Sequence, residues 1–130
     1  MSKLLIDRSK WLCGHELNRS KDKDSMLLNH NGEMCCLGFL GKQCEFQEES
    51  LLACYTPDGT GIDRWPEGVI NLEAFKDTPW TAVAVRVNDS RSLSDSDRES
   101  ILIDHFKAIG YSIIFTGNYQ DNKYNGLVTI

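Results

Sequence analysis

The residues best suited to chemistry in this chain are five cysteines and three histidines. Tetrahedral zinc sites use cysteine and histidine pairs separated by about two to four residues, so that one turn presents both ligands. Neither Cys13 with His15 nor the adjacent Cys35 and Cys36 has that spacing. We therefore predict no metal site and no cofactor, and we expect the cysteines to be small core residues. The side chains considered as ligands are Cys13, His15, His30, Cys35, Cys36, Cys44 and Cys54.

A cysteine nucleophile would need an imidazole within reach and a lowered thiol pKa. His15, His30 and His105 are the candidate bases, but the sequence does not reveal whether any of them lies beside a thiol, and it contains no known catalytic-cysteine signature. His105 follows Asp104 on a predicted helix, where adjacent side chains diverge. We predict no catalytic residues, and a cysteine-dependent enzyme is the third of three functional hypotheses.

Two glycine-containing strings resemble ligand loops only superficially. The string Gly38-Phe-Leu-Gly41 lacks the Gly-Lys-Ser/Thr of a phosphate-binding loop, and its glycine spacing favours close helix packing. The string Asp58-Gly-Thr-Gly-Ile-Asp63 lacks the alternating oxygen ligands and terminal glutamate of an EF-hand. Both strings are expected to be structural.

The composition is that of an ordinary globular domain. The 130 residues are 41% hydrophobic and 25% charged, and the net charge is −5. We predict a single α+β domain over residues 1–130 that folds without metal or disulfides. The acidic balance disfavours nucleic acid and membranes as partners. Because no apolar stretch has the length of a signal peptide or a bilayer span, we expect a cytoplasmic protein with reduced thiols.

Hydrophobic periodicity and turn residues predict the elements that must position these side chains. A strand is expected at 4–6, and Asp7 can cap a short helix over 8–13 that ends at Gly14. The Asn-Gly pair at 31–32 predicts a hairpin over 25–36. The other elements expected before residue 69 are a polar loop at 15–25, helices at 37–44 and 48–54, and a surface loop at 55–68 pinned by Trp65.

The strongest helix signal lies in the second half of the chain. Ser94 and Asp97 form a capping box, and apolar residues then recur on one face until Gly110 ends the helix. Strands are expected at 111–115 and at 127–130. The apolar face consists of Leu102, Phe106 and Ile109, widened by Ile101 and Ile103.

The predicted assembly is a small antiparallel sheet packed against three or four helices. The sheet is expected to combine the hairpin at 25–36 with strands within 111–130. Residues 116–130 would be a C-terminal extension of it. Residues 79–87 remain open, because their composition suits a strand and their periodicity also suits a helix.

Three segments carry a distinctive combination of residues. They are Ile6-Asp-Arg-Ser-Lys-Trp-Leu-Cys-Gly14, Met34-Cys-Cys-Leu-Gly-Phe39, and Val87-Asn-Asp89 followed by Leu93-Ser-Asp-Ser-Asp-Arg-Glu99 and by the stretch from Phe106 to Phe115. In this order they resemble a family of small uncharacterised proteins of bacteriophages and prophages. The resemblance covers about residues 4–115. It implies a phage accessory gene product, favours a helix over 79–87, and supplies no catalytic residues.

The leading functional hypothesis is therefore a non-enzymatic phage accessory protein that binds a host macromolecule, most simply a host protein, and modulates or inhibits it, with host defence as one target. The alternative is a small-molecule or nucleotide pocket between the loops at 55–68 and 86–92. The oligomeric state is left open. Aromatic residues dominate interface energetics, so the predicted binding residues are loop aromatics together with a polar patch. They are Tyr55, Trp65, Arg86, Asn88, Asp89, Arg91, Tyr119 and Tyr124.

Overall fold

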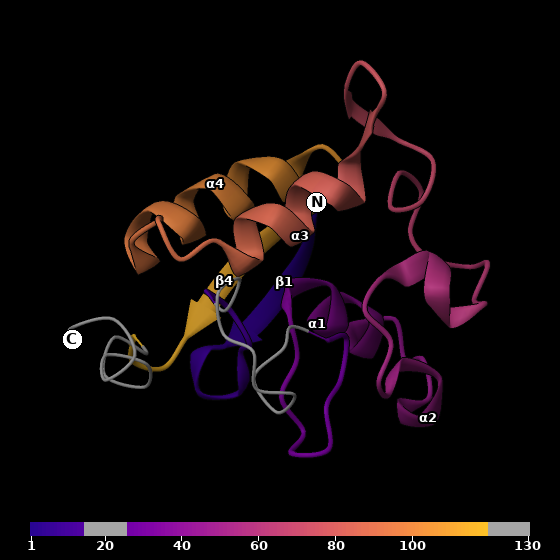
Figure 1. The fold of residues 1–130 in the computed structure, drawn as a ribbon, viewed down its shortest axis with the longest axis horizontal. Helices are drawn as coiled ribbons and strands as arrows, with labels where there is room; N and C mark the ends of the chain where they lie inside the picture. Colours follow the sequence, from indigo (N-terminus) through magenta and orange to yellow (C-terminus); the bar gives the residue numbers. More distant parts are fainter. Residues whose placement is uncertain (15–25, 120–130) are drawn as a thin grey trace.

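The computed structural model describes residues 1–14 and 26–119 (Figure 1). The α+β class expected from the sequence is confirmed. None of the helices in these two ranges is long and apolar enough to cross a bilayer. In chain order the elements are β1 (Ser2–Asp7), a 3-10 helix (Arg8–Lys10), α1 (Cys36–Gln43), α2 (Glu48–Leu51), a 3-10 helix (Pro57–Thr60), β2 (Glu73–Phe75), β3 (Thr78–Pro79), α3 (Trp80–Asp89), α4 (Asp95–Lys107) and β4 (Tyr111–Thr116).

The principal sheet is a pair of parallel strands, β1 and β4, in which Leu4 lies opposite Ile113 and Ile6 opposite Phe115. Antiparallel pairing, which we expected throughout, joins the short strands β2 and β3 instead. Parallel pairing needs a long crossover, and α4 provides its last step by returning the chain to the starting end of β1. Figure 1 shows α3 and α4 on one side of the pair and α1 beside β1.

Within the predicted hairpin at 25–36, the described residues 26–36 reverse direction as predicted. Gly32 has a φ of 78°, a left-handed conformation that glycine adopts without strain. The Asn29 side-chain oxygen accepts hydrogen bonds from the N–H groups of Asn31 and Glu33, each at 2.9 Å. The side chain of Asn29 therefore closes the turn over residues 29–34.

The arms of this turn do not form the predicted hairpin strands. Met34 forms a parallel bridge with Trp11, and Leu28 forms one with Leu52. The Leu12 N–H donates to the Met34 carbonyl at 2.7 Å, so the first helix ends at Lys10 rather than continuing to residue 13. Each arm satisfies its backbone groups against a different neighbour, and this corrects the hairpin and the sheet we expected from it.

α1 begins at a tightly packed corner, as the glycine and cysteine string at 34–39 suggested. A Cβ atom on Gly38 would lie 1.8 Å from the Leu27 carbonyl oxygen and 2.8 Å from the Met34 Cβ atom. Only glycine permits this approach of helix to backbone. The helices expected at 37–44 and 48–54 are present as α1 and the shorter α2.

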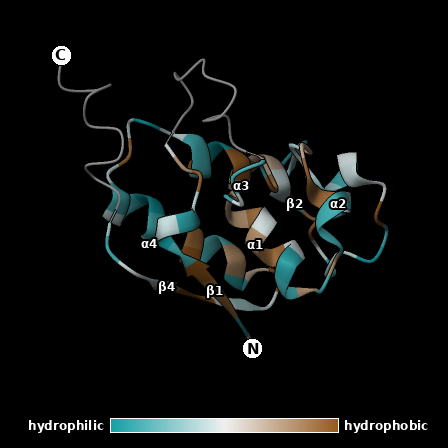
Figure 2. Cartoon of the chain, turned by 90° about the horizontal axis from the view of Figure 1, so that it is seen from below, coloured by the Kyte–Doolittle hydropathy of each residue, from teal (hydrophilic) through white to brown (hydrophobic). Residues whose placement is uncertain are grey.

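The stretch at 79–87 is helical, as the phage-protein resemblance favoured. Trp80, Ala84 and Asn88 recur every fourth residue and form the buried face of α3. On α4, Phe106 meets the Trp80 ring edge-to-face at 5.0 Å between centroids. Figure 2 shows apolar residues concentrated in β1 and in the middle of the molecule, with hydrophilic residues on the outer turns.

The capping box at the start of α4 is confirmed. The Ser94 side chain accepts a hydrogen bond from the Asp97 N–H at 3.1 Å. Leu102 and Phe106 are fully buried on the predicted face, whereas Ile101 is 40% exposed. β4 confirms the strand at 111–115, and the strand expected at 127–130 lies outside the described residues.

We predict that Gly38→Ala destabilises the protein by about 3 kcal/mol, because the added methyl group would overlap the backbone of residue 27. The matched control is Gly59→Ala, where the new Cβ atom would meet only the Thr56 hydroxyl, at 3.5 Å. Urea unfolding of both variants measures the difference. Equal stabilities would show that the corner is looser than described.

Candidate functional site

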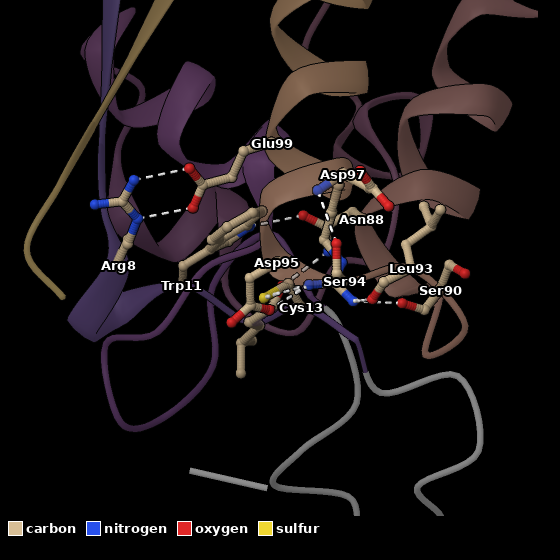
Figure 3. A network of polar contacts seen from close by, with 12 residues as sticks. Arg8, Trp11, Cys13, Asn88, Ser90, Leu93, Ser94, Asp95, Asp97 and Glu99 are labelled. Carbon is tan, nitrogen blue, oxygen red and sulfur yellow. Dashed lines mark hydrogen bonds and ion pairs between the residues drawn. The ribbon is translucent and has the colours of Figure 1, made fainter. Parts of the chain in front are cut away.

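The three segments of the phage-protein resemblance meet in the interior, around the carboxamide of Asn88 (Figure 3). Its oxygen accepts hydrogen bonds from the Trp11 indole N–H at 2.8 Å and from the Cys36 backbone N–H at 3.0 Å. Its nitrogen donates to the Leu12 carbonyl at 2.7 Å and to the Asp89 carboxylate at 3.0 Å. Asn88 is fully buried, so one side chain joins the segment after β1, the start of α1 and the end of α3.

A second buried cluster surrounds the Arg98 guanidinium at the start of α4. It donates to the Asp95 carboxylate at 2.7 Å and to the carbonyls of Ser90 and Leu93 at 2.5 and 3.0 Å. The Cys13 sulfur lies 4.0 Å from the same group. The cluster fixes the connection between α3 and α4, and Figure 3 shows it beside the Trp11–Asn88 contact.

A third contact links the end of β1 to α4. The Arg8 guanidinium forms two hydrogen bonds of 2.7 Å with the Glu99 carboxylate, and Glu99 raises the pKa of Arg8. Arg8 also donates to the Gly117 carbonyl at 2.5 Å and lies over the rings of Phe115 and Tyr119. The space between these groups is too small for a water molecule. The contact between Arg8 and Glu99 is therefore part of the scaffold and leaves no room for a ligand beside it.

The thiols are poorly placed for nucleophilic chemistry. All five cysteines are free, and Cys13, Cys35 and Cys36 are buried. Burial raises the pKa of Cys35 to about 12 and the pKa of Cys36 well above its ordinary value. Burial also raises the pKa of Cys44. A protonated, enclosed thiol neither attacks a substrate nor ligates a metal.

The described histidines do not meet a thiol. His105 stacks on Trp80 with ring centroids 4.6 Å apart, and its Nε2 lies 2.8 Å from the Trp80 carbonyl oxygen. Burial lowers the pKa of His105, so the neutral ring is favoured there. His30 is exposed on the turn, and His15 lies outside the described residues. Within residues 1–14 and 26–119, no group of three His, Cys, Asp or Glu side chains is arranged to hold a metal ion.

The predicted binding residues on the loop at 55–68 have different surroundings. Trp65 is buried, with its indole N–H 3.2 Å from the Thr60 hydroxyl and its ring edge-to-face with Phe46. The role of loop anchor that we gave it is confirmed. Tyr55 is 55% exposed and stays a predicted binding residue.

The remaining predicted residues do not form one patch with that loop. Asn88 lies in the core rather than at the surface, which corrects its expected place in a polar loop. Arg86 is exposed, and Asp89 and Arg91 are half-buried near it in sequence. Figure 1 shows the 55–68 loop beside α2, on the opposite side of the molecule from the connection between α3 and α4. Tyr119 is half-exposed beneath Arg8, and Tyr124 lies outside the described residues.

Two neighbouring open spaces lie beside the 29–34 turn. One cavity, of about 450 Å³, lies between this turn, α1 and α2. Its apolar lining includes Leu28, Met34, Phe46, Leu51 and Leu52, and its polar lining includes His30, Lys42, Glu48 and Glu49.

A second cavity, of about 580 Å³, adjoins the first and extends to the sheet. The two share Gly32, Met34 and Lys42. The rest of the second cavity is lined by Leu5, Asp7, Lys10, Phe39 and Thr116. We call the two cavities together the turn groove. Sequence reasoning missed it, although Leu5, an apolar residue that alternates with the buried Leu4 and Ile6, was an available signal.

Comparison of the chain with protein-family models, with curated proteins and with solved structures gave no match. The candidate site therefore rests on its geometry. The turn groove combines an apolar floor with charged residues at its rim, which is the anatomy of a binding site for another molecule.

We predict that Asn88→Leu destabilises the protein by on the order of 4 kcal/mol, because Trp11, Leu12 and Cys36 each lose a buried hydrogen-bond partner. Asn71→Leu is the matched control, since Asn71 is exposed. Thermal unfolding monitored by circular dichroism gives both values. If Asn88→Leu lost no more stability than the control variant, the hydrogen bonds of Asn88 would not be essential to the fold.

We also predict that an aromatic disulfide reagent labels Cys44 and Cys54 in the native protein and leaves Cys13, Cys35 and Cys36 unlabelled. Cys44 and Cys54 are partly exposed, whereas Cys13, Cys35 and Cys36 are buried, and burial raises the thiol pKa of Cys35 and Cys36. Peptide mass spectrometry identifies the labelled sites, and guanidinium should make all five react. Rapid native labelling of Cys35 or Cys36 would contradict the sealed interior.

Proposed function

We propose that this chain is a non-enzymatic phage accessory protein that binds a host protein and modulates or inhibits it in the host cytosol. The observation that carries the proposal is the turn groove, an apolar-floored concavity with charged rims. Cys13, Cys35 and Cys36 are buried, and none of the five cysteines lines either cavity. Binding without catalysis is the function that this arrangement supports best.

The lining of the groove suits a protein partner. Leu52 is 38% exposed at the rim of the first cavity and Leu5 is 57% exposed in the second, so each can be covered by apolar groups of a partner. Removing such apolar surface from water contributes about 25 cal/mol per Å² to the free energy of binding. Lys42 lies where the cavities adjoin, and charged rim residues of this kind set orientation and partner choice.

The nucleotide alternative loses its expected site. It required the loops at 55–68 and 86–92 to form one pocket, and the two loops lie apart in Figure 1. A nucleotide that nevertheless binds only the folded protein would raise its melting temperature, and the rise would grow with the nucleotide concentration. A thermal-shift screen of nucleotides therefore separates the two hypotheses, and we expect no shift.

The proposal is tested with Leu52→Asp, which places a charge on the apolar rim of the first cavity. Ile101→Asp is the matched control, because Ile101 is 40% exposed on α4 and Leu52 is 38% exposed. We predict that the tagged wild type and Ile101→Asp both enrich the same host protein from lysate. With Leu52→Asp, the enrichment of that protein should fall about tenfold, as expected for a charge buried at an interface. Quantitative mass spectrometry measures the enrichment.

Three results would count against the proposal. They are identical enrichment profiles for the two variants, no reproducible partner for the wild type, and stabilisation by a nucleotide. Circular dichroism of both variants confirms that each is folded before the comparison.

A further inference from the structure

The outer edge of β4 has no strand paired with it in the described part of the chain. The Ser2 N–H donates to the Gly110 carbonyl at 3.1 Å, and the parallel register places Ser2 opposite Tyr111. The ladder to β1 therefore uses the peptide groups of the even-numbered residues of β4, and successive residues of a strand direct their groups to opposite sides. Tyr111, Ile113 and Phe115 must direct theirs away from β1, along what we call the free edge of β4.

α4 covers a face of β4 and leaves this edge uncovered. Leu102 and Phe106 of α4 belong to the same buried core as Ile113, which is 5% exposed. Figure 2 shows α4 above β4, with β1 beside β4. Among residues 1–14 and 26–119, no hydrogen bond is made to the N–H or C=O groups of the three residues on the free edge.

The chain that follows β4 turns towards β1, away from the free edge. The Arg8 guanidinium, which comes directly after β1, donates to the Gly117 carbonyl at 2.5 Å. The same guanidinium lies over the Tyr119 ring, 4.5 Å from its centroid. Residues 117–119 are therefore held beside the end of β1.

β4 has none of the features that usually protect an exposed strand edge. Its sequence, Tyr-Ser-Ile-Ile-Phe-Thr, contains no charged residue and no proline, and its register with β1 is continuous over all six residues. Exposed edges usually carry a lysine, a proline or a bulge that prevents pairing with another chain. An uncharged strand rich in β-branched and aromatic residues pairs readily when it is left uncovered.

A second copy of β4 complements the free edge well. A two-fold axis through Ile113 gives an antiparallel pair in which Ile113 lies opposite its own counterpart and Tyr111 lies opposite Phe115 of the second copy. Cross-strand pairs of aromatic and β-branched residues stabilise a sheet. Because the strand is uncharged, it brings no like charges together, although each chain carries a net charge of −5.

We propose that the protein forms a dimer through the free edge of β4, in which two copies of this strand pair antiparallel about Ile113. The N–H and C=O groups of Ile113 in each copy pair with those of the other, and the sheet continues across the axis. Residues 111–115 do not line the turn groove, so the dimer leaves a groove open on each copy. This inference goes beyond the proposed function and does not depend on it.

The dimer should be weak enough to dissociate on dilution. Pairing of one short strand buries less surface than the about 1,200–2,000 Å² of a stable interface, so we expect a dissociation constant on the order of 10–100 μM. Sedimentation velocity of the full chain should show monomer below this range and dimer above it. A chain that stays monomeric up to about 1 mM would overturn the proposal.

A pair of double variants tests the position of the axis. Ser112 and Ile114 have their side chains on the outer face of the sheet, and in the dimer Ser112 of one copy lies opposite Ile114 of the other. Ser112→Lys with Ile114→Lys places like charges opposite each other, and we expect at least about tenfold weaker dimerisation. Ser112→Glu with Ile114→Lys is the matched control, because it places opposite charges there and should keep the dimer. Circular dichroism confirms that both variants are folded.

Amide exchange in the wild type tests the backbone pairing without a substitution. The N–H groups of Ile113 and Phe115 should exchange at least about tenfold more slowly where the dimer dominates than where the monomer dominates. Those of Ser112 and Ile114, which belong to the ladder with β1, should change little. Slow exchange of Ile113 in the monomer would mean that another part of the same chain covers the edge, and would overturn the dimer.

The two double variants also identify a dimer that uses another surface. A wild-type dimer that the two variants weaken equally, or that neither weakens, would overturn pairing through β4. The host-protein test with Leu52→Asp concerns the turn groove, which the dimer leaves open. Its result therefore stands whichever way the dimer test falls.

Discussion

The structure depends on one buried carboxamide, that of Asn88. It holds the Trp11 indole, the Leu12 carbonyl and the Cys36 N–H at 2.7–3.0 Å in the buried interior. A buried polar group left unpaired costs about 1–3 kcal/mol, so these three segments reach their lowest free energy only together. Met34 is then held beside Trp11, which places the 29–34 turn at the end of the sheet and forms the shared wall of the turn groove.

The position of α1 follows from the same constraint and explains why the principal sheet has two strands in the described part of the chain. Because Asn88 fixes Cys36 beside α3, the helix that starts there runs alongside β1, where a third strand would otherwise lie (Figure 1). A helix side chain can replace a strand donor at one residue, as Gln43 does at Lys3, but not along a whole edge. The N–H and C=O of Leu5 accordingly have no hydrogen-bond partner among the described residues, whereas the proposed function rests on the turn groove.

Local signals accounted for much of the fold. The cap of α4 was predictable because Ser94 and Asp97 interact within one turn, and the reversal at residue 32 was predictable because glycine tolerates its positive φ. The parallel pairing of β1 with β4 was not, because it depends on how a crossover of about a hundred residues packs, which no local pattern encodes. The hairpin failed for the same reason: its turn is local, but its arms pair with distant segments.

The site was harder to predict than the fold. Asn88 was named as a binding residue because it belongs to a polar stretch with Arg86 and Asp89, although its spacing from Trp80 and Ala84 marks the buried face of α3. The turn groove is formed by residues from β1, the turn, α1 and α2, which come together only through tertiary packing. Tyr55, Arg86 and Tyr119 are exposed, but none of them lines the groove. They remain predicted binding residues that are separate from the groove.

The central claim about the scaffold is that β1 hydrogen-bonds to β4 along one edge, while α1, which lies along the other edge, leaves the Leu5 N–H without a partner among the described residues. Hydrogen exchange of the unliganded protein, followed amide by amide by NMR, tests it most directly, because exchange reports whether each N–H is hydrogen-bonded. The account predicts alternation along the strand, with slow exchange at Leu4 and Ile6 and exchange at Leu5 faster by at least about a hundredfold. Uniformly slow exchange from residue 4 to residue 6 would show that the Leu5 N–H is hydrogen-bonded as well, and would contradict the account.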